Sequence, residues 1–266
     1  MSPASTVQPT GPLVGARLVG GRRRQPRLRR LLRDFASVLI LSGLLLLVDA
    51  GVTLLWQEPL TAVIGLIERS EINQRFLSYQ STPLSPLDRR ALALLSAIPR
   101  RIAYLAREEQ RRVPTGAALG RIAIPKIGAD YVVVQGTDTS SLEKGPGHYP
   151  STALPGLGQT VAIAGHRTTY LAPFRHLDAL AKGNQIVLRM PYGRFIYQVQ
   201  ATRIVSPTSW WITRNVGYDR LVLSACNPLY SAAQRIVVFA RLIQTVPLGA
   251  AVAVPGPGTP SPQAPL

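Results

Sequence analysis

A long run of apolar residues stands near the beginning of the chain. Residues 35–56 contain one ionisable side chain, Asp49. A helix of this length measures about 33 Å, enough to cross the hydrocarbon core of a bilayer. The run therefore predicts one transmembrane helix. A cleaved signal peptide is the alternative, because Val48 and Ala50 supply small residues at the positions that a signal peptidase reads.

The pattern after the apolar run is that of amphipathic helices. Between residues 60 and 67 the apolar positions recur three and four residues apart, and a helical pattern resumes at Asp88 after a break with two prolines. Asp88 is a plausible N-cap, and Pro99 predicts a kink. We interpret residues 57–115 as a helical stalk or packing arm outside the membrane.

The periodicity changes at Gly116, where short β-branched runs begin to alternate with turn residues. This pattern, with few helices, predicts an all-β sandwich or barrel over residues 116–246. The predicted strands fall within residues 121–128, 131–136, 160–166, 185–190, 194–205, 220–226 and 235–243. Residues 247–266 are rich in proline and uncharged, which predicts a disordered tail.

Charge gives the predicted membrane segment a direction. The net charge is +17, and residues 1–33 hold eight arginines and no acidic residue. Positive charge on one side of a single span favours a cytoplasmic location for that side. We therefore expect residues 1–34 to form a cytoplasmic tail, and the chain after residue 56 to lie outside the cell. Membrane topology explains the arginines better than nucleic-acid binding.

Cys226 is the only cysteine, which excludes an internal disulfide and a zinc site with two thiolates. It ends the predicted strand "LVLSAC", so it is either a small buried residue or a reactive thiol at a rim. His166 ends another predicted strand, after a glycine that permits close backbone approach. For the other two histidines, His148 and His176, a structural role is favoured. Arg235 begins the next strand, and a solvated arginine is the alternative to an oxyanion-binding one.

Three ordered segments carry a resemblance to a known family. "VAIAGHRTTY" (161–170), "LVLSACNPLY" (221–230) and "AAQRIVVFARL" (232–242) resemble the sortases, most of all the class E sortases of high-GC actinobacteria. The resemblance covers about residues 117–243. It implies a closed eight-stranded β-barrel and a cysteine transpeptidase. We expect no cofactor and assign no metal ligand, and the sequence leaves metal dependence open.

The resemblance also implies roles for individual residues. Cys226 would be the nucleophile, His166 the acid and base, and Arg235 the group that steadies the substrate or oxyanion. The implied reaction cleaves an LPxTG- or LAxTG-like sorting signal between Thr and Gly and transfers the surface protein to an amine of a peptidoglycan precursor. The implied partners are those proteins, that amine and the lipid bilayer. Further candidates for substrate contact are Thr168, Tyr170, Ser224 and Ala225.

The chain departs from the family pattern beside the cysteine. The usual T-L-x-T-C is replaced by residues 222–226, with Ala225 in place of the second Thr, and Asn227 stands where many class E enzymes have His. These changes bear on signal preference more than on activity. The alternatives are a catalytically degenerate exported β-domain that binds wall proteins, a hydrolytic cysteine peptidase and a pilus-assembling sortase. The last is disfavoured because no lid motif precedes the barrel.

Overall fold

The computed structural model describes residues 26–55, 59–80 and 84–253. The chain divides into two compact units, Met1–Gly51 and Val52–Leu266.

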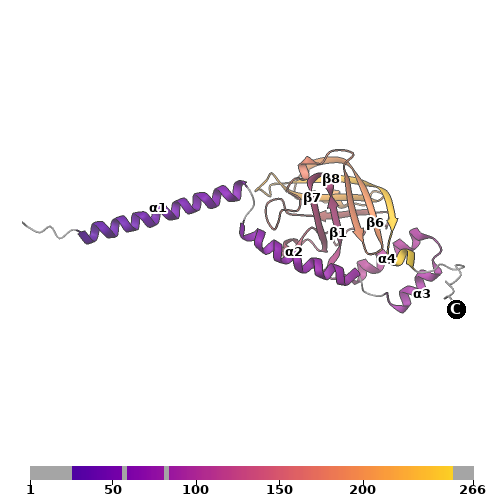
Figure 1. Cartoon of the computed structure of the whole chain (residues 1–266). Helices are drawn as coiled ribbons and strands as arrows, with labels where there is room; N and C mark the ends of the chain where they lie inside the picture. Colours follow the sequence, from indigo (N-terminus) through magenta and orange to yellow (C-terminus); the bar gives the residue numbers. More distant parts are fainter. Residues whose placement is uncertain (1–25, 56–58, 81–83, 254–266) are drawn as a thin grey trace, which may run out of the picture. The chain divides into compact units, whose positions relative to one another are not determined.

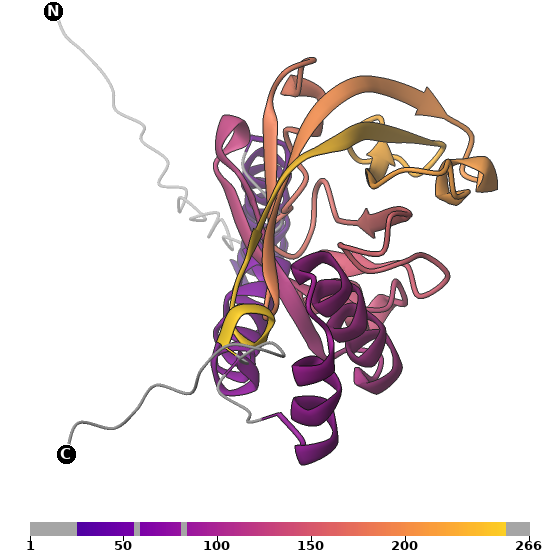
Figure 2. The same ribbon diagram turned by 90° about the vertical axis from the view of Figure 1, so that its right-hand side faces the viewer.

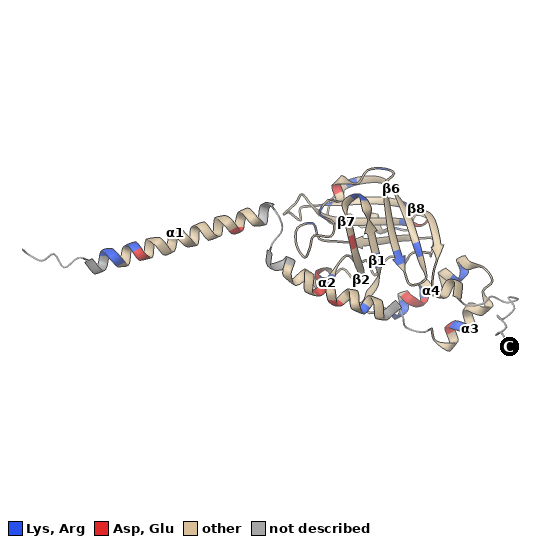
Figure 3. Cartoon of the chain, viewed as in Figure 1, with Lys and Arg blue, Asp and Glu red and all other residues tan. Residues whose placement is uncertain are grey.

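The first unit holds most of a long helix, α1 (Pro26–Leu55). Within its segment Arg29–Val52, a stretch of 18 residues has a mean hydropathy of 2.2 and no buried residue, so α1 is long and apolar enough to cross a membrane. Basic residues stand at the beginning of α1, and a long uncharged stretch follows them (Figure 3). The predicted span falls within this helix as far as Leu55, and Trp56 lies outside the described residues.

The second unit contains the β-structure and further helices. Its α-helices are α2 (Pro59–Gln80), α3 (Pro86–Leu94), α4 (Ile98–Arg112), α5 (Thr139–Lys144) and α6 (Ala250–Ala253). Short 3-10 helices are η1 (Pro125–Ile127), η2 (Leu177–Ala179) and η3 (Trp210–Thr213). The strands are β1 (Ala118–Ile124), β2 (Ala129–Gln135), β3 (Gly147–His148), β4 (Thr160–Ala164), β5 (Gln185–Met190), β6 (Gly193–Val205), β7 (Arg220–Asn227) and β8 (Gln234–Pro247).

The eight strands close into a barrel in the order β1-β2-β3-β4-β7-β8-β6-β5 (Figure 1). The β2–β3 and β4–β7 pairs are parallel, and the other pairs described are antiparallel. The prediction of a closed eight-stranded barrel is confirmed. Of the two architectures that the strand pattern alone allowed, the barrel is the one formed.

Alternation of side chains builds the barrel core. On β6, Phe195, Tyr197 and Val199 are buried, and Gln198 between them is exposed, which is the period of two expected for a strand with one wet face. On β7, by contrast, Leu221 to Ala225 are all buried. A strand that is buried on both faces needs a cover on the outside of the barrel, and η3 supplies one for β7.

Helix α2 packs along the outside of β1 and β2. Ile72 and Phe76 form a hydrophobic cluster with Ala118 of β1 and with Val132 and Val134 of β2. These contacts make α2 a helix packed on the barrel rather than a free stalk.

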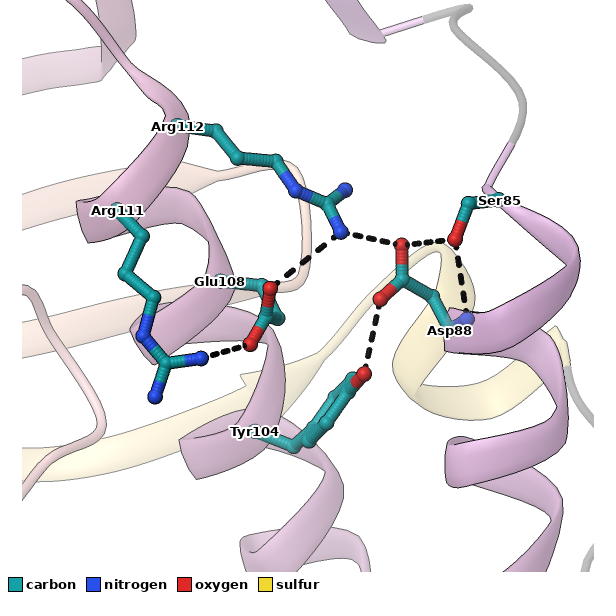
Figure 4. Close-up of polar contacts among 6 residues, drawn as sticks. All are labelled: Ser85, Asp88, Tyr104, Glu108, Arg111 and Arg112. Atoms are coloured by element: carbon teal, nitrogen blue, oxygen red, sulfur yellow. Dashed lines mark hydrogen bonds and ion pairs between the residues drawn. The ribbon is translucent and has the colours of Figure 1, made fainter.

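A polar network joins α3 to α4 around the buried carboxylate of Asp88 (Figure 4). The carboxylate accepts hydrogen bonds from Ser85 Oγ at 2.7 Å, Tyr104 Oη at 2.8 Å and Arg112 Nη2 at 2.7 Å. Ser85 Oγ also accepts from the Asp88 amide at 3.1 Å, so Ser85 is the N-cap of α3. The prediction of Asp88 as N-cap was wrong by three residues.

Two further sequence predictions are corrected. Pro99 does not kink a continuous helix, because α3 ends at Leu94 and a new helix, α4, begins at Ile98. Pro99 stands in the first turn of α4, where backbone N–H groups have no acceptor within the helix, so the missing N–H of proline costs nothing. The predicted disordered tail is ordered at its beginning, because β8 runs to Pro247 and Ala251 of α6 is buried in the main core. Figure 2 shows α6, in yellow, at the same end of the barrel as α4. Residues 254–266 lie outside the described residues.

Candidate active site

Strands β4 and β7 run parallel and in register, from the pair Thr160–Arg220 to the pair Ala164–Ser224. The Gly165 amide continues the pairing by donating to the Ser224 carbonyl at 3.0 Å. His166 and Cys226 each stand two residues beyond the Ala164–Ser224 pair. The fold therefore brings both to the same edge of the sheet, where the carboxyl ends of the two strands meet.

Strands β7 and β8 are antiparallel and pair Cys226 directly with Arg235. The loop between them thus returns the chain beside the cysteine, as the sequence predicts. Because side chains alternate along a strand, Cys226 shares the outer face of β7 with Ser224, whereas Ala225 points into the main core. Cys226 is partly exposed, which argues against the alternative of a small buried residue.

The imidazole of His166 lies in a half-buried setting. Its ring packs against Tyr170 with the centroids 5.3 Å apart, and Tyr170 Oη donates to Glu143 Oε1 at 2.9 Å. Burial lowers the pKa of His166 below its usual value, and the Glu143 carboxylate opposes this without cancelling it. His166 Nε2 is buried and has no hydrogen-bond partner within the described part of the chain. A neutral imidazole is therefore favoured, with one nitrogen not engaged by the protein.

The backbone around His166 is shaped by close packing. A Cβ at Gly165 would lie 2.5 Å from the ring of Phe174, so only glycine fits there. Further along the loop, Tyr170, Leu171 and Ala172 all have positive φ angles of 49°, 63° and 41°. Such angles are uncommon in residues other than glycine, and consecutive ones mark a backbone held by its surroundings.

Arg167 connects the histidine loop to the cysteine strand. Its side chain is almost fully buried and forms an ion pair with Asp178 at 3.2 Å. Its Nη1 atom donates to Asn227 Oδ1 at 3.0 Å and to the Cys226 carbonyl at 3.4 Å. The Nε atom donates to the Arg175 carbonyl at 3.2 Å. One guanidinium thus holds three stretches of chain around the candidate site.

The guanidinium of Arg235 is turned toward its own loop. Its Nη1 atom donates to the carbonyls of Ala232 at 2.8 Å and Gln234 at 2.9 Å. Both of these bonds use the same nitrogen of the fork. Within the described part of the chain, Nη2 and Nε of Arg235 form no hydrogen bond, so these donors are left for another acceptor.

The weaker sequence candidates fall into two groups. Thr168 and Tyr170 are half-buried in the loop after His166. Ser224 is buried and shares a hydrogen bond of 3.0 Å with Tyr149 Oη, and Ala225 is buried in the core. Burial of these two side chains argues against direct contact with a substrate.

The remaining histidines lie outside this site. His148 is fully buried, with Nδ1 2.8 Å from Gln135 Oε1 and Nε2 3.0 Å from the Ala153 carbonyl. Burial lowers its pKa from 6.5 to about 4. His176 is exposed and precedes η2. The structural role favoured for His148 agrees with these contacts.

The 3-10 helix η3 covers the outer face of β7 near the site. Its Ile212 packs in a cluster with Ala162, Val222, Val237 and Phe239. Trp211 stacks on Phe239 with the ring centroids 5.8 Å apart, and the neighbouring Trp210 is 78% exposed. Sequence reasoning did not single out these residues, nor Arg167 and Glu143. For Arg167 a signal existed, because it directly follows His166 in the quoted segment.

Comparisons with known proteins agree with this arrangement. The family model described as "Sortase: Sortase domain" matches residues 122–243. Sortase D of Bacillus subtilis (strain 168) is 35% identical over 133 residues, which cover 48% of this chain and 66% of that protein. Sortase SrtE1 of Streptomyces coelicolor is 26% identical over 148 residues, which cover 50% of this chain and 42% of that protein. The chain thus matches less than two thirds of the length of either relative.

A solved structure is similar as well. Sortase E from Streptomyces avermitilis is 32% identical, with a TM-score of 0.46, and the match covers 50% of this chain and 93% of that one. The family prediction rests on the domain match and on the relatives, which include both a sortase D and a sortase E. The chain belongs to the sortase family.

Proposed function

We propose that the chain is a membrane-anchored cysteine transpeptidase. In this proposal it cleaves an LPxTG- or LAxTG-like sorting signal between Thr and Gly and joins the surface protein to an amine of a cell-wall precursor. The observation that carries the proposal is the strand register, since β4, β7 and β8 bring His166, Cys226 and Arg235 to one edge of the barrel.

The first half-reaction forms an acyl-enzyme. The neutral imidazole of His166 takes the proton of the Cys226 thiol, and the thiolate attacks the Thr carbonyl. The C–N bond to Gly then breaks as the imidazolium gives its proton to the departing amine. The product is a thioester on Cys226 and a free glycine amine. The lowered pKa of His166 suits the first proton transfer, because the imidazole is neutral before the reaction begins.

The second half-reaction releases the acyl group. The precursor amine attacks the thioester, His166 takes the proton that the amine loses, and the Cys226 thiolate leaves. That thiolate recovers a proton from the imidazolium, which returns the site to its starting state. Arg235 donates from Nη2 or Nε to the substrate or to the oxyanion of either tetrahedral intermediate, since its Nη1 is held by its own loop. Thr168 and Tyr170 contact the substrate in this proposal.

The proposed location follows from charge and hydropathy. Residues 1–34 form the cytoplasmic tail, residues 35–56 the single span, and residues 57–115 the helical arm outside the cell. The catalytic barrel occupies residues 116–246 outside the cell. Arginines on the N-terminal side of α1 support this orientation.

The proposal is tested with the Val52–Leu266 unit and a peptide that contains L-A-x-T-G, with and without a glycine-type amine. We expect cleavage between Thr and Gly and joining of the amine to Thr. Cys226→Ala abolishes both, whereas Ser231→Ala in the adjoining loop serves as the matched control and retains both.

Other outcomes identify other functions. Cleavage without joining indicates a hydrolytic peptidase or an unsuitable acceptor. Absence of cleavage for several signal variants, in a folded protein whose Cys226 also resists alkylation, contradicts the proposal and favours an exported binding domain.

A further inference from the structure

The first turns of α2 expose a patch of large aliphatic side chains. Val63, Ile64, Leu66 and Ile67 have 47–64% of their surface exposed. Soluble surfaces carry single exposed aliphatic residues without consequence, but a contiguous group on one helix marks an interaction site. We call these four residues the α2 patch.

The α2 patch is not the face that packs on the barrel. Gly65, Ile72 and Phe76 are buried toward β1, β2 and the loop after His166. At 3.6 residues per turn, Val63 and Ile67 project on the opposite side of the helix from Gly65. The patch is also local, because the charged residues of α2 begin at Glu68 (Figure 3).

Chain connectivity limits what can cover the α2 patch. Residues 56–58 alone separate the end of α1 at Leu55 from the beginning of α2 at Pro59. Four successive Cα steps span at most about 15 Å. If α1 crosses the bilayer, the first turn of α2 therefore begins within that distance of the membrane surface. Continuity of the chain with α1 therefore favours lipid as the occupant of the α2 patch.

We propose that Val63, Ile64, Leu66 and Ile67 insert into the boundary between headgroups and acyl chains of the outer leaflet. This inference rests on the membrane anchor of the proposed function. Interfacial helices bury one aliphatic face about 5–10 Å into that boundary and keep their polar face in water. Here the opposite face of the helix is occupied by the barrel, so lipid contact fixes the catalytic unit on the membrane.

The lipid contact also sets the distance between the candidate active site and the membrane surface. A Cβ at Gly65 would lie 2.9 Å from Leu171 Cγ and 3.3 Å from Tyr170 Cα, so α2 touches the loop whose Tyr170 packs on His166. This loop is separated from the lipid by one helix, whose diameter is about 10 Å. An acceptor amine carried on a lipid-linked precursor would reach the site there, whereas an acceptor deep in the wall would not.

The experiment uses the full chain with Cys226→Ser, reconstituted in vesicles of phosphatidylcholine and phosphatidylglycerol. Single cysteines are introduced as Ile67→Cys in the patch, as Gln74→Cys two turns further along, and as Leu45→Cys in α1. Each carries a nitroxide spin label, and collisions with oxygen, which enters lipid, are compared with collisions with a nickel chelate, which does not. Gln74 is the matched control, since it is exposed on the same helix beyond the patch.

We expect the oxygen-to-nickel ratio to be several-fold higher at position 67 than at position 74, and highest at position 45. Equal ratios at 67 and 74 would overturn the inference. Spin–spin broadening at 67 alone would also overturn it and identify a second copy of the chain as the occupant. A low ratio at position 45 would remove the anchor on which the inference rests.

A second measurement connects the patch to turnover without depending on the labels. In vesicles, Val63→Ser with Ile67→Ser should slow transfer to a lipid-linked amine and leave transfer to a soluble amine unchanged. Equal loss with both amines would contradict the inference. If neither the natural chain nor the variant joins any amine, the proposed function fails, while the collision ratios still decide the lipid contact.

Discussion

Arg167 donates a hydrogen bond from Nη1 to Asn227 Oδ1 at 3.0 Å, which links the residue after His166 to the residue after Cys226. The same guanidinium forms an ion pair with Asp178 at 3.2 Å. The spacing of the two proposed catalytic groups therefore depends on a buried side chain that takes no part in bond making.

Replacing the guanidinium of Arg167 tests whether this residue positions the catalytic groups without taking part in the reaction. Arg167→Lys keeps the charge but cannot form the forked contacts to two chain segments. We expect kcat to fall about tenfold, a cost of about 1.4 kcal/mol in the transition state, with KM little changed. Steady-state kinetics with the signal peptide provide the measurement. The control is Arg241→Lys, because Arg241 is an exposed arginine that lies over the Tyr218 ring. Equal losses of kcat in both variants would refute a positioning role for Arg167.

The acid limb of the pH–rate profile reports the pKa of the general base, which is His166 in the proposed mechanism. Burial lowers the pKa of His166, and the Glu143 carboxylate raises it in part. Removal of that negative charge by Glu143→Gln should therefore lower the pKa further and move the acid limb of kcat/KM to lower pH. NMR titration of the His166 ring gives the same quantity directly. Glu108→Gln on α4 should leave both unchanged, and an upward shift in Glu143→Gln would contradict the assignment.

His148 should make the fold sensitive to acid. Its pKa falls from 6.5 to about 4 on folding because the ring is buried, so the unfolded chain binds the proton more tightly. The stability is present above pH 6.5 and is lost as the pH falls toward 4, by about 3 kcal/mol in total. Urea unfolding of the Val52–Leu266 unit at several pH values measures this loss. His148→Gln should flatten that part of the curve, His176→Gln should not, and identical curves for all three proteins would disprove the prediction.

Asp88 should be a stabilising residue, since its hydrogen-bond partners Ser85, Tyr104 and Arg112 lie on α3 and α4 or at their ends. Burial raises the pKa of its carboxyl, but hydrogen bonds from Ser85, Arg112 and Tyr104 outweigh this and hold the pKa below its usual value. Asp88→Ala removes a buried carboxylate that accepts three hydrogen bonds and should lower the free energy of unfolding by about 3 kcal/mol. Arg111→Ala removes an exposed ion pair and should cost less than about 1 kcal/mol. Equal costs in the two unfolding curves would contradict the importance of the network.

Gly165 should tolerate no larger residue. The Cβ of Gly165→Ala would lie 2.5 Å from the Phe174 ring, and overpacking of this kind costs about 1–3 kcal/mol. We expect lower thermal stability and lower activity, because the displaced segment carries His166. Adding Phe174→Leu should restore part of both. If the single variant is as stable and as active as the natural protein, the packing argument is wrong.

Local pattern predicted the strands but not their closure. Alternation on β6 and the apolar run of β7 indicate strands, yet both fit a sandwich as well as a barrel, because closure depends on which strands pair. The resemblance to sortases supplied the closed barrel, and the strand order confirms it. For the end of the chain, the proline-rich composition predicted disorder from residue 247. Ala251 is nevertheless buried, because it packs on α4 and the barrel core, and composition does not report such contacts.

The candidate site was partly visible in the sequence. Cys226, His166 and Arg235 stand at predicted strand ends, so their convergence follows once the strands are paired. The N-cap of α3 was also readable, because Ser85 and Asp88 have the spacing of a capping box. Arg167 was not identified, since its partners Asp178 and Asn227 are distant in sequence and only the fold brings them together.

Trapping the acyl-enzyme shows whether Cys226 is the nucleophile. The Val52–Leu266 unit is mixed with excess signal peptide, quenched in acid and analysed by intact mass and by mass analysis of its proteolytic peptides. We predict an added mass equal to the peptide up to Thr, carried on Cys226 and absent in Cys226→Ala. Peptide cleavage without an adduct on Cys226, or cleavage that persists in Cys226→Ala, would contradict it.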